Sequence, residues 1–397
     1  MRRFVRLICI CLCLCIACPA LAEADVEAQL RAIFTRFSTL GASVAVFANG
    51  RITYTYQYGQ RSLGGEAVTA DTLFQVGSIS KMVSNMGLMQ LVERQGISLD
   101  TPLAELLGID IAHPRYPDEP VTLRQLMTHT ASLRDSHLYN NALTGGGESL
   151  KDMFGQYRSF HFYSYHEPGT HREYSNFGGG LIGSLIEKLS GQTIDDYMQE
   201  NIFGPMNIRA AFQPMRLGAD APFADMYRMP EKQLAKRLSE DTLHITQADP
   251  LHHYYLTAGK LVISAPDLCR LLIALCDGGI YENTRLLKES TVHEMTTRQN
   301  WRGSVRCESG HGLFMNIITD DQVQGRTLYG HGGRAHGMLC AAYFDPTDRT
   351  GVVMLTNGCR NTSMYNGVGM LGRQVLTLCY NEIIGPDHVT EDPFQVE

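Results

Sequence analysis

The chain has 397 residues, of which 44% are hydrophobic and 19% are charged, with 38 glycines and 15 prolines. This is the composition of a globular protein, and it excludes a disordered or fibrous chain. The formal net charge is −7 and no basic run occurs, so the chain is a poor candidate for binding nucleic acid or an anionic membrane surface.

The first 22 residues have the pattern of a secretory signal peptide. Three arginines precede a 12-residue apolar run, Leu7 to Cys18, and the segment ends on Ala20-Leu21-Ala22. A basic start, a short apolar run and a small-x-small site are typical of such signals. The run is too short to span a bilayer, and no later run reaches the roughly 18 residues needed. We therefore expect a secreted, periplasmic or cell-envelope protein without an integral membrane span after cleavage. Lipidation of Cys18 is the alternative.

Six cysteines follow the signal, all in the last third of the chain: Cys269, Cys276, Cys307, Cys340, Cys359 and Cys379. Their spacing includes no Cys-X-X-Cys pair, so neither a zinc ribbon nor a thioredoxin-like motif is supported. An even number in an exported chain permits disulfides, and buried free thiols are the open alternative. No metal-binding pattern is present, and we expect neither a metal nor an organic cofactor.

The mature chain begins with patterns for a helix and a hairpin. Apolar residues recur at helical spacing over residues 25–38. Two alternating runs follow, Ser43–Phe47 and Ile52–Tyr58, and Asn49-Gly50 between them is a strong hairpin signal. A short apolar run, Leu73–Val76, comes next.

Helical patterns dominate the middle of the chain: Ser78–Gln95, Thr122–Thr128, Leu181–Leu189, Ile194–Ile202 and Ala265–Leu275. Strand patterns return later, at Gly312–Ile318, Thr327–His331, Met338–Phe344 and Gly351–Thr356, before a last helical pattern at Met364–Ile383. This order predicts an α+β fold in one domain, residues 23–397. An antiparallel sheet of the N-terminal hairpin and C-terminal strands would be flanked by helices, with a helical lobe inserted over about 97–300. A cleft between the two lobes would hold the site.

The first candidate for chemistry is Ser78-Ile79-Ser80-Lys81. On a helix, a spacing of three places Ser78 and Lys81 on one face, and the free amides of the helix N-terminus can hold an oxyanion. The helix dipole disfavours a positive charge in the first turn. A lysine there does not stabilise the helix, so the position of Lys81 favours a role as a base. The alternative is an N-cap serine and a solvated lysine. The chain has seven lysines and a single Ser-X-X-Lys.

The second candidate is Tyr174-Ser175-Asn176. A serine–lysine enzyme needs a third group to pass the proton to the leaving group, and a phenol beside a cation can do so. Tyr-X-Asn occurs three times, at Tyr139, Tyr174 and Tyr281. Tyr174 stands between Pro168-Gly169-Thr170 and a run of three glycines, which predicts a tight turn that projects its side chain. Tyr139 and Tyr281 lie in polar turns, and we expect them at the surface.

The third candidate, His331-Gly332-Gly333, lies at the end of a predicted strand. Glycine in a strand often marks close approach of a ligand. A substrate lying along this edge could pair with the strand, with Gly333 in contact and the Arg334 N–H as the second oxyanion donor. The alternative is a glycine-rich bend with a structural histidine.

In this order, the three motifs resemble those of the serine β-lactamase and penicillin-binding-protein superfamily. They are most similar to its class C β-lactamase-related branch of DD-carboxypeptidases, D-aminopeptidases and esterases. The resemblance implies a β-lactamase/transpeptidase-like fold, with Ser78 as the acylated nucleophile, Lys81 as its base partner and Tyr174 as the proton shuttle. It also implies that Asn176 orients the substrate and the lysine, while His331 stands where β-lactamases usually have the lysine of Lys-Thr-Gly.

That histidine is a departure from the family's pattern. No Lys-X-Gly occurs, His331 is neutral or weakly charged near pH 7, and Gly332 lacks the hydroxyl that usually contacts a substrate carboxylate. Arg334 is the candidate for the missing cation. We therefore expect an exported serine hydrolase acting on D-amino-acid peptides or small esters. The alternatives are a β-lactamase and a penicillin- or peptide-sensing binding domain with slow deacylation.

Overall fold

The computed structural model describes residues 24–141, 147–155, 160–300, 310–319, 323, 325–360, 364–365 and 367–385. The predicted signal peptide with Cys18, and Cys307 further on, lie outside these residues. Within the described part of the chain, no helix is long and apolar enough to cross a membrane.

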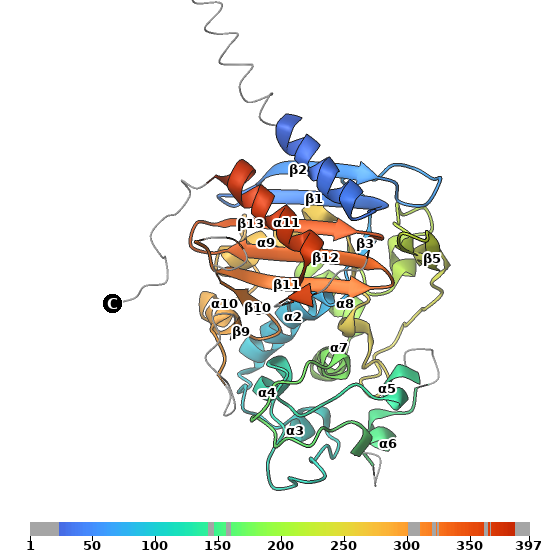
Figure 1. Ribbon diagram of the computed structural model, residues 1–397. Coiled ribbons are helices and arrows are strands. Elements are labelled where there is room, and N and C mark those ends of the chain that lie inside the picture. The colour runs from blue at the N-terminus through green and yellow to red at the C-terminus, as the bar shows by residue number, and fades with distance from the viewer. Residues whose placement is uncertain are drawn as a thin grey trace, which may run out of the picture.

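A seven-stranded antiparallel sheet forms the upper part of the molecule in Figure 1, in the order β2-β1-β13-β12-β11-β10-β9. Its strands are β1 (Gly41–Ala48), β2 (Arg51–Gly59), β9 (Gly310–His311), β10 (Asn316–Ile318), β11 (Leu328–Ala335), β12 (Met338–Asp345) and β13 (Thr350–Thr356). β1 pairs with β13 from Ala42–Thr356 to Ala48–Thr350. The N-terminal hairpin and the C-terminal strands therefore share one sheet, which confirms the predicted α+β architecture.

Helices cover both faces of the sheet (Figure 1). Alternate residues of a strand point to opposite faces. Val44 and Val46 of β1 accordingly pack with the helix over residues 24–36 and with α11 (Met370–Leu378), which continues as a π-helical turn, Cys379–Ile384. Ala45 and Phe47 belong to the core on the other face, where α9 (Ala265–Cys276) contacts β1 and β13.

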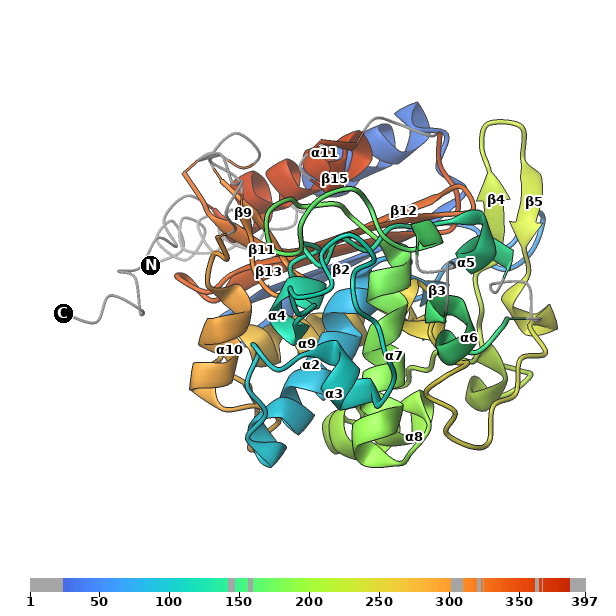
Figure 2. The same ribbon diagram turned by 90° about the horizontal axis from the view of Figure 1, so that it is seen from below.

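The helical lobe lies below the sheet and is seen from beneath in Figure 2. Its helices are α3 (Leu103–Leu107), α4 (Leu123–Met127), α5 (His137–Asn141), α6 (Leu150–Phe154), α7 (Asn176–Ser190) and α8 (Ile194–Met198), which continues as a π-helical turn, Gln199–Phe203. The segment predicted for this lobe, 97–300, also contains α9, which packs on the sheet instead.

Short strand pairs and turns make up the rest of the described elements. Two-stranded pairs are formed by β3 (Phe74–Gln75) with β6 (Val262–Ile263), β4 (Met226–Arg228) with β5 (Gln233–Lys236), β7 (Ile280–Tyr281) with β8 (Thr284–Arg285), and β14 (Met364–Tyr365) with β15 (Val368–Gly369). The remaining pieces are α10 (Glu289–Thr296) and 3-10 turns at Gly204–Met206, Pro214–Leu217, Leu238–Glu240 and Leu256–Ala258.

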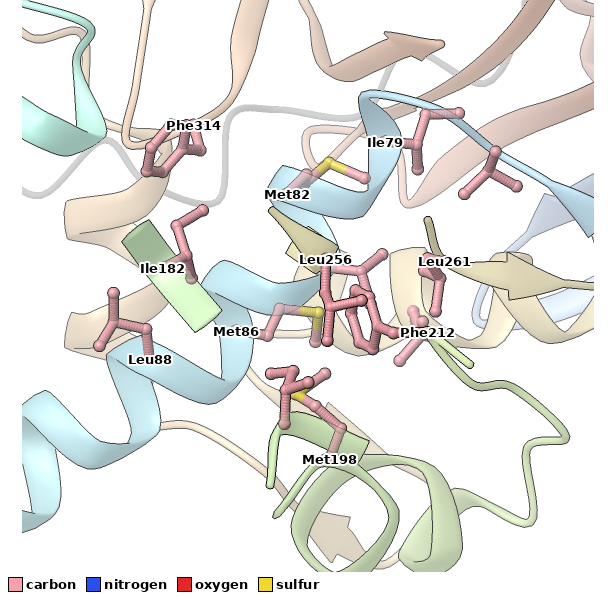
Figure 3. Packing of buried hydrophobic residues seen from close by; sticks show 14 of the residues in the cluster. Ile79, Met82, Met86, Leu88, Ile182, Met198, Phe212, Leu256, Leu261 and Phe314 are labelled. Carbon is pink, nitrogen blue, oxygen red and sulfur yellow. The ribbon is translucent and has the colours of Figure 1, made fainter. Parts of the chain in front are cut away.

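The central helix α2 (Ile79–Gln95) joins sheet and lobe, and its residues from Ile79 to Val92 are all buried. Figure 3 shows Met82 and Met86 packed among side chains from other elements, including Phe212 and Leu256. Because close-packed cores resist displacement, this burial holds the N-terminal end of α2 in place at the junction of the two lobes.

Two predicted elements differ in their bounds. The last helix begins at Met370 rather than Met364, since Gly367, at φ +81°, interrupts the pattern. Of the predicted strand Gly312–Ile318, only Asn316–Ile318 (β10) forms a strand, because Phe314, at φ +50°, turns the chain after β9, which lies before the predicted range. Of the two alternatives for the cysteines, disulfides or buried free thiols, the described residues show the second. The buried free thiols are Cys269, Cys276, Cys340, Cys359 and Cys379.

Candidate active site

Ser78 ends the tight connection between β3 and α2. Gly77 adopts φ +55°, and a methyl group there would lie 3.0 Å from the backbone nitrogen of Arg334, so glycine lets the two segments approach. Ser78 precedes the first residue of α2, yet its side chain makes no cap hydrogen bond. The N-cap alternative for Ser78 is therefore wrong, because its Oγ is bonded to two other side chains.

Lys81 is the first of these partners, and it is fully buried, with 0% of its surface exposed. Its Nζ donates to Ser78 Oγ at 3.2 Å, to Asn176 Oδ1 at 2.9 Å and to the carbonyl oxygen of Ala258 at 2.6 Å. The solvated-lysine alternative is wrong, because an ammonium can be buried only where its donors are satisfied. Here three acceptors from three segments surround it.

Tyr174 is the second partner, and its hydroxyl donates to Ser78 Oγ at 2.6 Å. The ring lies 4.5 Å from the ring of His129, centroid to centroid, and 5.0 Å from Lys81 Nζ. His129 is itself tied to the same segment, since its Nδ1 accepts from the Ser175 N–H at 3.3 Å. Tyr174 is thus held by ring contacts between a buried histidine and a buried lysine.

The other two Tyr-X-Asn tyrosines do not join this cluster. The expectation that Tyr139 is a surface residue is wrong, because α5 turns its ring into the core, where it is 1% exposed and packs 5.4 Å from Phe177. Tyr281 is half-buried in β7. The three glycines after Asn176 do not form a turn either, since α7 begins at Asn176 and includes them.

Asp135 is a site residue that the sequence motifs do not indicate. Its carboxylate accepts from Ser175 Oγ at 3.1 Å, from Asn176 Nδ2 at 2.8 Å and from the Phe177 N–H at 2.9 Å. Since the Asn176 amide nitrogen is directed at Asp135, its Oδ1 is directed at Lys81. No spacing pattern relates Asp135 to the three motifs, and only its place beside the start of α7 reveals it.

His331 lies in the middle of β11 rather than at a strand end, because the β11–β12 ladder continues to Ala335. The side chain is 5% exposed, and its Nδ1 donates to the Gly332 carbonyl oxygen at 2.6 Å. Burial lowers the pKa of His331 to about 3, and the nearby charges of Lys81 and Arg172 act in the same direction. The imidazole is therefore neutral near pH 7.

The backbone of Arg334 faces the cleft. Its partner in the β11–β12 register is Leu339, whose N–H and carbonyl oxygen both bond the Thr356 hydroxyl on β13. Backbone groups along an antiparallel strand alternate between its two neighbours, so those of Arg334 point away from β12. The Ser78 N–H stands at the start of α2, where amides have no intrahelical acceptor.

The two glycines after His331 allow close packing on opposite faces of β11. A methyl group at Gly333 would lie less than 3.0 Å from the Val76 carbonyl oxygen. A methyl group at Gly332 would lie less than 3.0 Å from the Gly367 carbonyl oxygen. Gly333 therefore faces β3. The space that a hydroxyl-bearing side chain would need at position 332 is occupied by the backbone of Gly367, which precedes α11.

One pocket of about 450 Å³ lies at this cluster, and Lys81, Asp135 and Gly333 are not among the residues that line it. Its lining consists of Ser78, Arg172, Tyr174, Asn176, Gly310, His311, Asn316, Ile317, His331, Gly332, Arg334, Met364 and Gly367. Sequence reasoning missed Arg172 and Asn316, and it interpreted His311 as a structural residue. In the described part of the chain, no group of three or more potential metal ligands is present.

The sheet, the helical lobe and the serine–lysine–tyrosine cluster between them define a class C-like serine hydrolase architecture. The chain matches the family described as Beta-lactamase over residues 30–373 and belongs to it. Members of this family are serine hydrolases.

Known proteins match nearly the whole chain. Penicillin-binding protein 4 of Amycolatopsis lactamdurans is 29% identical over 86% of this chain and 87% of its own length. A D-aminopeptidase of Brucella ovis is 23% identical over 87% of this chain and 61% of its own length. The structure of a class C β-lactamase variant superimposes with a TM-score of 0.68 at 18% identity, covering 90% of this chain and 97% of that one. This likeness confirms the predicted β-lactamase/transpeptidase-like fold.

Proposed function

We propose that the chain is an exported serine hydrolase that forms an acyl-enzyme on Ser78 and acts on D-amino-acid peptides or small esters. The observation that carries the proposal is the place of Ser78 Oγ, 2.6 Å from Tyr174 OH and 3.2 Å from Lys81 Nζ, at the edge of the pocket. A serine hydroxyl becomes a nucleophile when an adjacent group accepts its proton. Two such groups lie within hydrogen-bond reach.

The partners of Lys81 orient it for this task. Asn176 Oδ1 and the Ala258 carbonyl can only accept, so they occupy two N–H groups of the amine. When Lys81 is neutral, its lone pair is then directed at Ser78 Oγ. Either Lys81 or the phenolate of Tyr174 takes the serine proton as Oγ bonds to the carbonyl carbon.

The later steps use the rest of the cluster. The N–H groups of Ser78 and Arg334 stabilise the oxyanion of the tetrahedral intermediate. Tyr174 then donates a proton to the leaving amine or alcohol as the C–N or C–O bond breaks. Water attacks the resulting ester and releases the acid product and free Ser78.

The substrate class rests on two supports. A relative named D-aminopeptidase matches 87% of the chain, which favours D-amino-acid residues in the substrate without specifying the charge of the substrate. The neutral His331 in the third motif removes the positive charge that a lysine would place there, which weighs against efficient β-lactam hydrolysis.

Steady-state hydrolysis of a chromogenic ester by the mature protein, beside Ser78→Ala, tests this proposal. We expect many turnovers by the wild type and none above background by the variant, followed by activity on D-peptides in preference to penicillins. A single unreleased adduct on Ser78, detected by intact mass, would instead identify a sensing domain. Equal rates without an adduct would overturn acyl transfer.

Export is the second part of the proposal, and it rests on residues 1–22. N-terminal sequencing of the protein recovered from the cell envelope or medium tests it. We expect Glu23 as the first residue, whereas an intact Met1 on a cytoplasmic protein would contradict export, and a blocked chain starting at Cys18 would identify a lipoprotein.

A further inference from the structure

Arg172 is a cation in the pocket, and it has no counter-charge among the residues that the structure describes. It lies two residues before Tyr174 and lines the pocket together with Ser78. Its Nε is inaccessible to solvent and has no hydrogen-bond partner, and no ion pair joins it to any acidic residue in the described ranges. Burial lowers the pKa of the guanidinium to about 10, so it stays charged at neutral pH.

Such an arrangement costs free energy unless a ligand completes it. A partly buried charge without a partner loses hydration and gains no compensating attraction. A guanidinium is planar, weakly hydrated and able to donate two parallel hydrogen bonds to a carboxylate. We propose that Arg172 binds a free carboxylate of the substrate, which makes anionic esters or amides the preferred substrates. The proposal rests on the proposed acyl transfer at Ser78 and adds the charge of the substrate.

The described neighbours of Arg172 supply no negative charge. The described lining residues include no aspartate or glutamate. Burial lowers the pKa of His311 and of His331 to about 3, with Arg172 contributing to both shifts, so both rings are neutral. Lys81 and Arg334 are the other basic residues at the site. The pocket therefore carries a positive field that attracts a carboxylate and repels the free ammonium group of an aminopeptidase substrate.

Arg334 is the other candidate for binding the substrate carboxylate, but its surroundings differ from those of Arg172. Its side chain is exposed and also borders a second hollow, of about 550 Å³, beside His336 and Met338. Water can solvate it in the absence of ligand, so it has less to gain from a carboxylate than Arg172. Comparing variants of the two arginines separates these assignments.

The test uses two matched pairs of depsipeptide or ester substrates and the full mature protein. In one pair the leaving group is D-lactate or neutral D-lactamide, each esterified to N-acetyl-D-alanine. In the other pair the acyl group is a hemisuccinate or its amide, on a p-nitrophenyl leaving group. D-alanine p-nitroanilide supplies an ammonium-bearing substrate. We expect at least one carboxylate substrate to be preferred over its amide by kcat/KM, and the ammonium substrate to be poor.

Arg172→Met keeps the apolar stem and removes the charge. We expect it to lower kcat/KM for the preferred carboxylate substrate by roughly 100-fold while changing that for the amide by less than about 3-fold. Arg172→Lys should recover part of the loss. Arg51→Gln, on the exposed hairpin strand β2, is the control for net charge and should keep the wild-type preference.

Several results would overturn the assignment: no carboxylate preference in either pair, a preference that survives Arg172→Met, or one lost in Arg334→Gln instead. If Arg172→Met fails to fold, inhibition by D-lactate against D-lactamide, and by succinate against succinamide, is compared in the wild type and Arg334→Gln. A carboxylate preference that persists in Arg334→Gln supports Arg172, and one that is absent from the wild type or lost in Arg334→Gln overturns it. Turnover of the neutral substrates without any preference would refute only the carboxylate site. Failure of every substrate to react with Ser78 would refute the proposed function.

Discussion

Gly179 and Lys81 are in contact across the α2–α7 interface, and the glycine makes room for the lysine. A methyl group built on Gly179 would lie less than 3.0 Å from the Cδ and Cε atoms of Lys81. The lysine is fully buried and bonded to three acceptors, so it has no free space into which to move. The position of the amine beside Ser78 therefore depends on the absence of a side chain on the neighbouring helix.

Gly179→Ala should consequently abolish activity. Alanine favours a helix over glycine by up to about 1 kcal/mol, so the loss would come from displacement of Lys81 and not from weak helix formation. We expect kcat/KM on a chromogenic ester to fall at least about 100-fold, equivalent to about 2.7 kcal/mol. Gly178→Ala is the matched control, because its methyl would lie 3.4 Å from Leu126 Cδ1. A fully active Gly179→Ala protein would refute this view of the interface.

Asp135→Asn tests whether Asp135 positions Asn176. In the variant, an NH2 group replaces one of the two carboxylate oxygens that accept hydrogen bonds. This NH2 donor would then face another donor, either Asn176 Nδ2 or the Phe177 N–H, and one hydrogen bond would be lost. We expect kcat to fall about 10- to 100-fold and the free energy of unfolding to fall by about 1–2 kcal/mol. In a double-mutant cycle, Asp135→Asn should cost little further kcat in an Asn176→Ala background. Additive losses in kcat would mean that Asp135 acts on stability alone.

Burial of His331 predicts a loss of stability in acid. The pKa is about 3 in the folded state and 6.5 in the reference state, so between these values the unfolded chain binds the extra proton. The contribution of His331 is complete above pH 6.5 and is lost as the pH falls toward 3, at a slope of about 1.4 kcal/mol per pH unit. Denaturant titrations from pH 4.5 to 7.5 on wild type and His331→Gln should differ by that slope. Parallel curves would show that the ring already titrates normally when folded.

Gly332→Thr should not create a β-lactamase-like third motif. The added Cβ would collide with the Gly367 carbonyl oxygen, and backbone cannot yield as the end of a flexible side chain can. We expect a lower melting temperature and reduced ester hydrolysis, with no gain in penicillin turnover. A variant with wild-type melting temperature and faster penicillin hydrolysis would show that the segment before α11 moves aside readily.

The thiols of Cys340, Cys359 and Cys379 should be inert in the folded protein. All three are buried, and burial raises the pKa of each to about 12. Because the thiolate is the reactive form, alkylation by iodoacetamide at pH 8 should modify them only after unfolding. Peptide mapping by mass spectrometry measures this directly. Rapid labelling under native conditions, or a mapped disulfide among them, would contradict the packing.

The hydrophobic periodicity and the residue spacing of single segments were enough to predict much of this fold and several residues of the candidate site. Period-two and helical spacing identified the hairpin, the C-terminal strands and α2, since each pattern reflects burial of one face of a single element. The spacing of three between Ser78 and Lys81 worked because it is set by helix geometry alone. Tyr174 was separated from Tyr139 and Tyr281 by the glycine and proline residues around it.

Only the tertiary structure revealed the features that depend on contacts between residues far apart in the sequence. Asp135 bonds to Asn176 across 41 positions in the sequence. Arg172 becomes significant because the described residues around it in space supply no negative charge. Tyr139 was misplaced at the surface because its sequence neighbours are polar, whereas its burial depends on Phe177 on another helix. The lowering of the His331 pKa to about 3 follows from desolvation, and the need for glycine at Gly179 and Gly332 follows from steric contact between distant segments. Those depend on the folded packing, which no sequence spacing encodes.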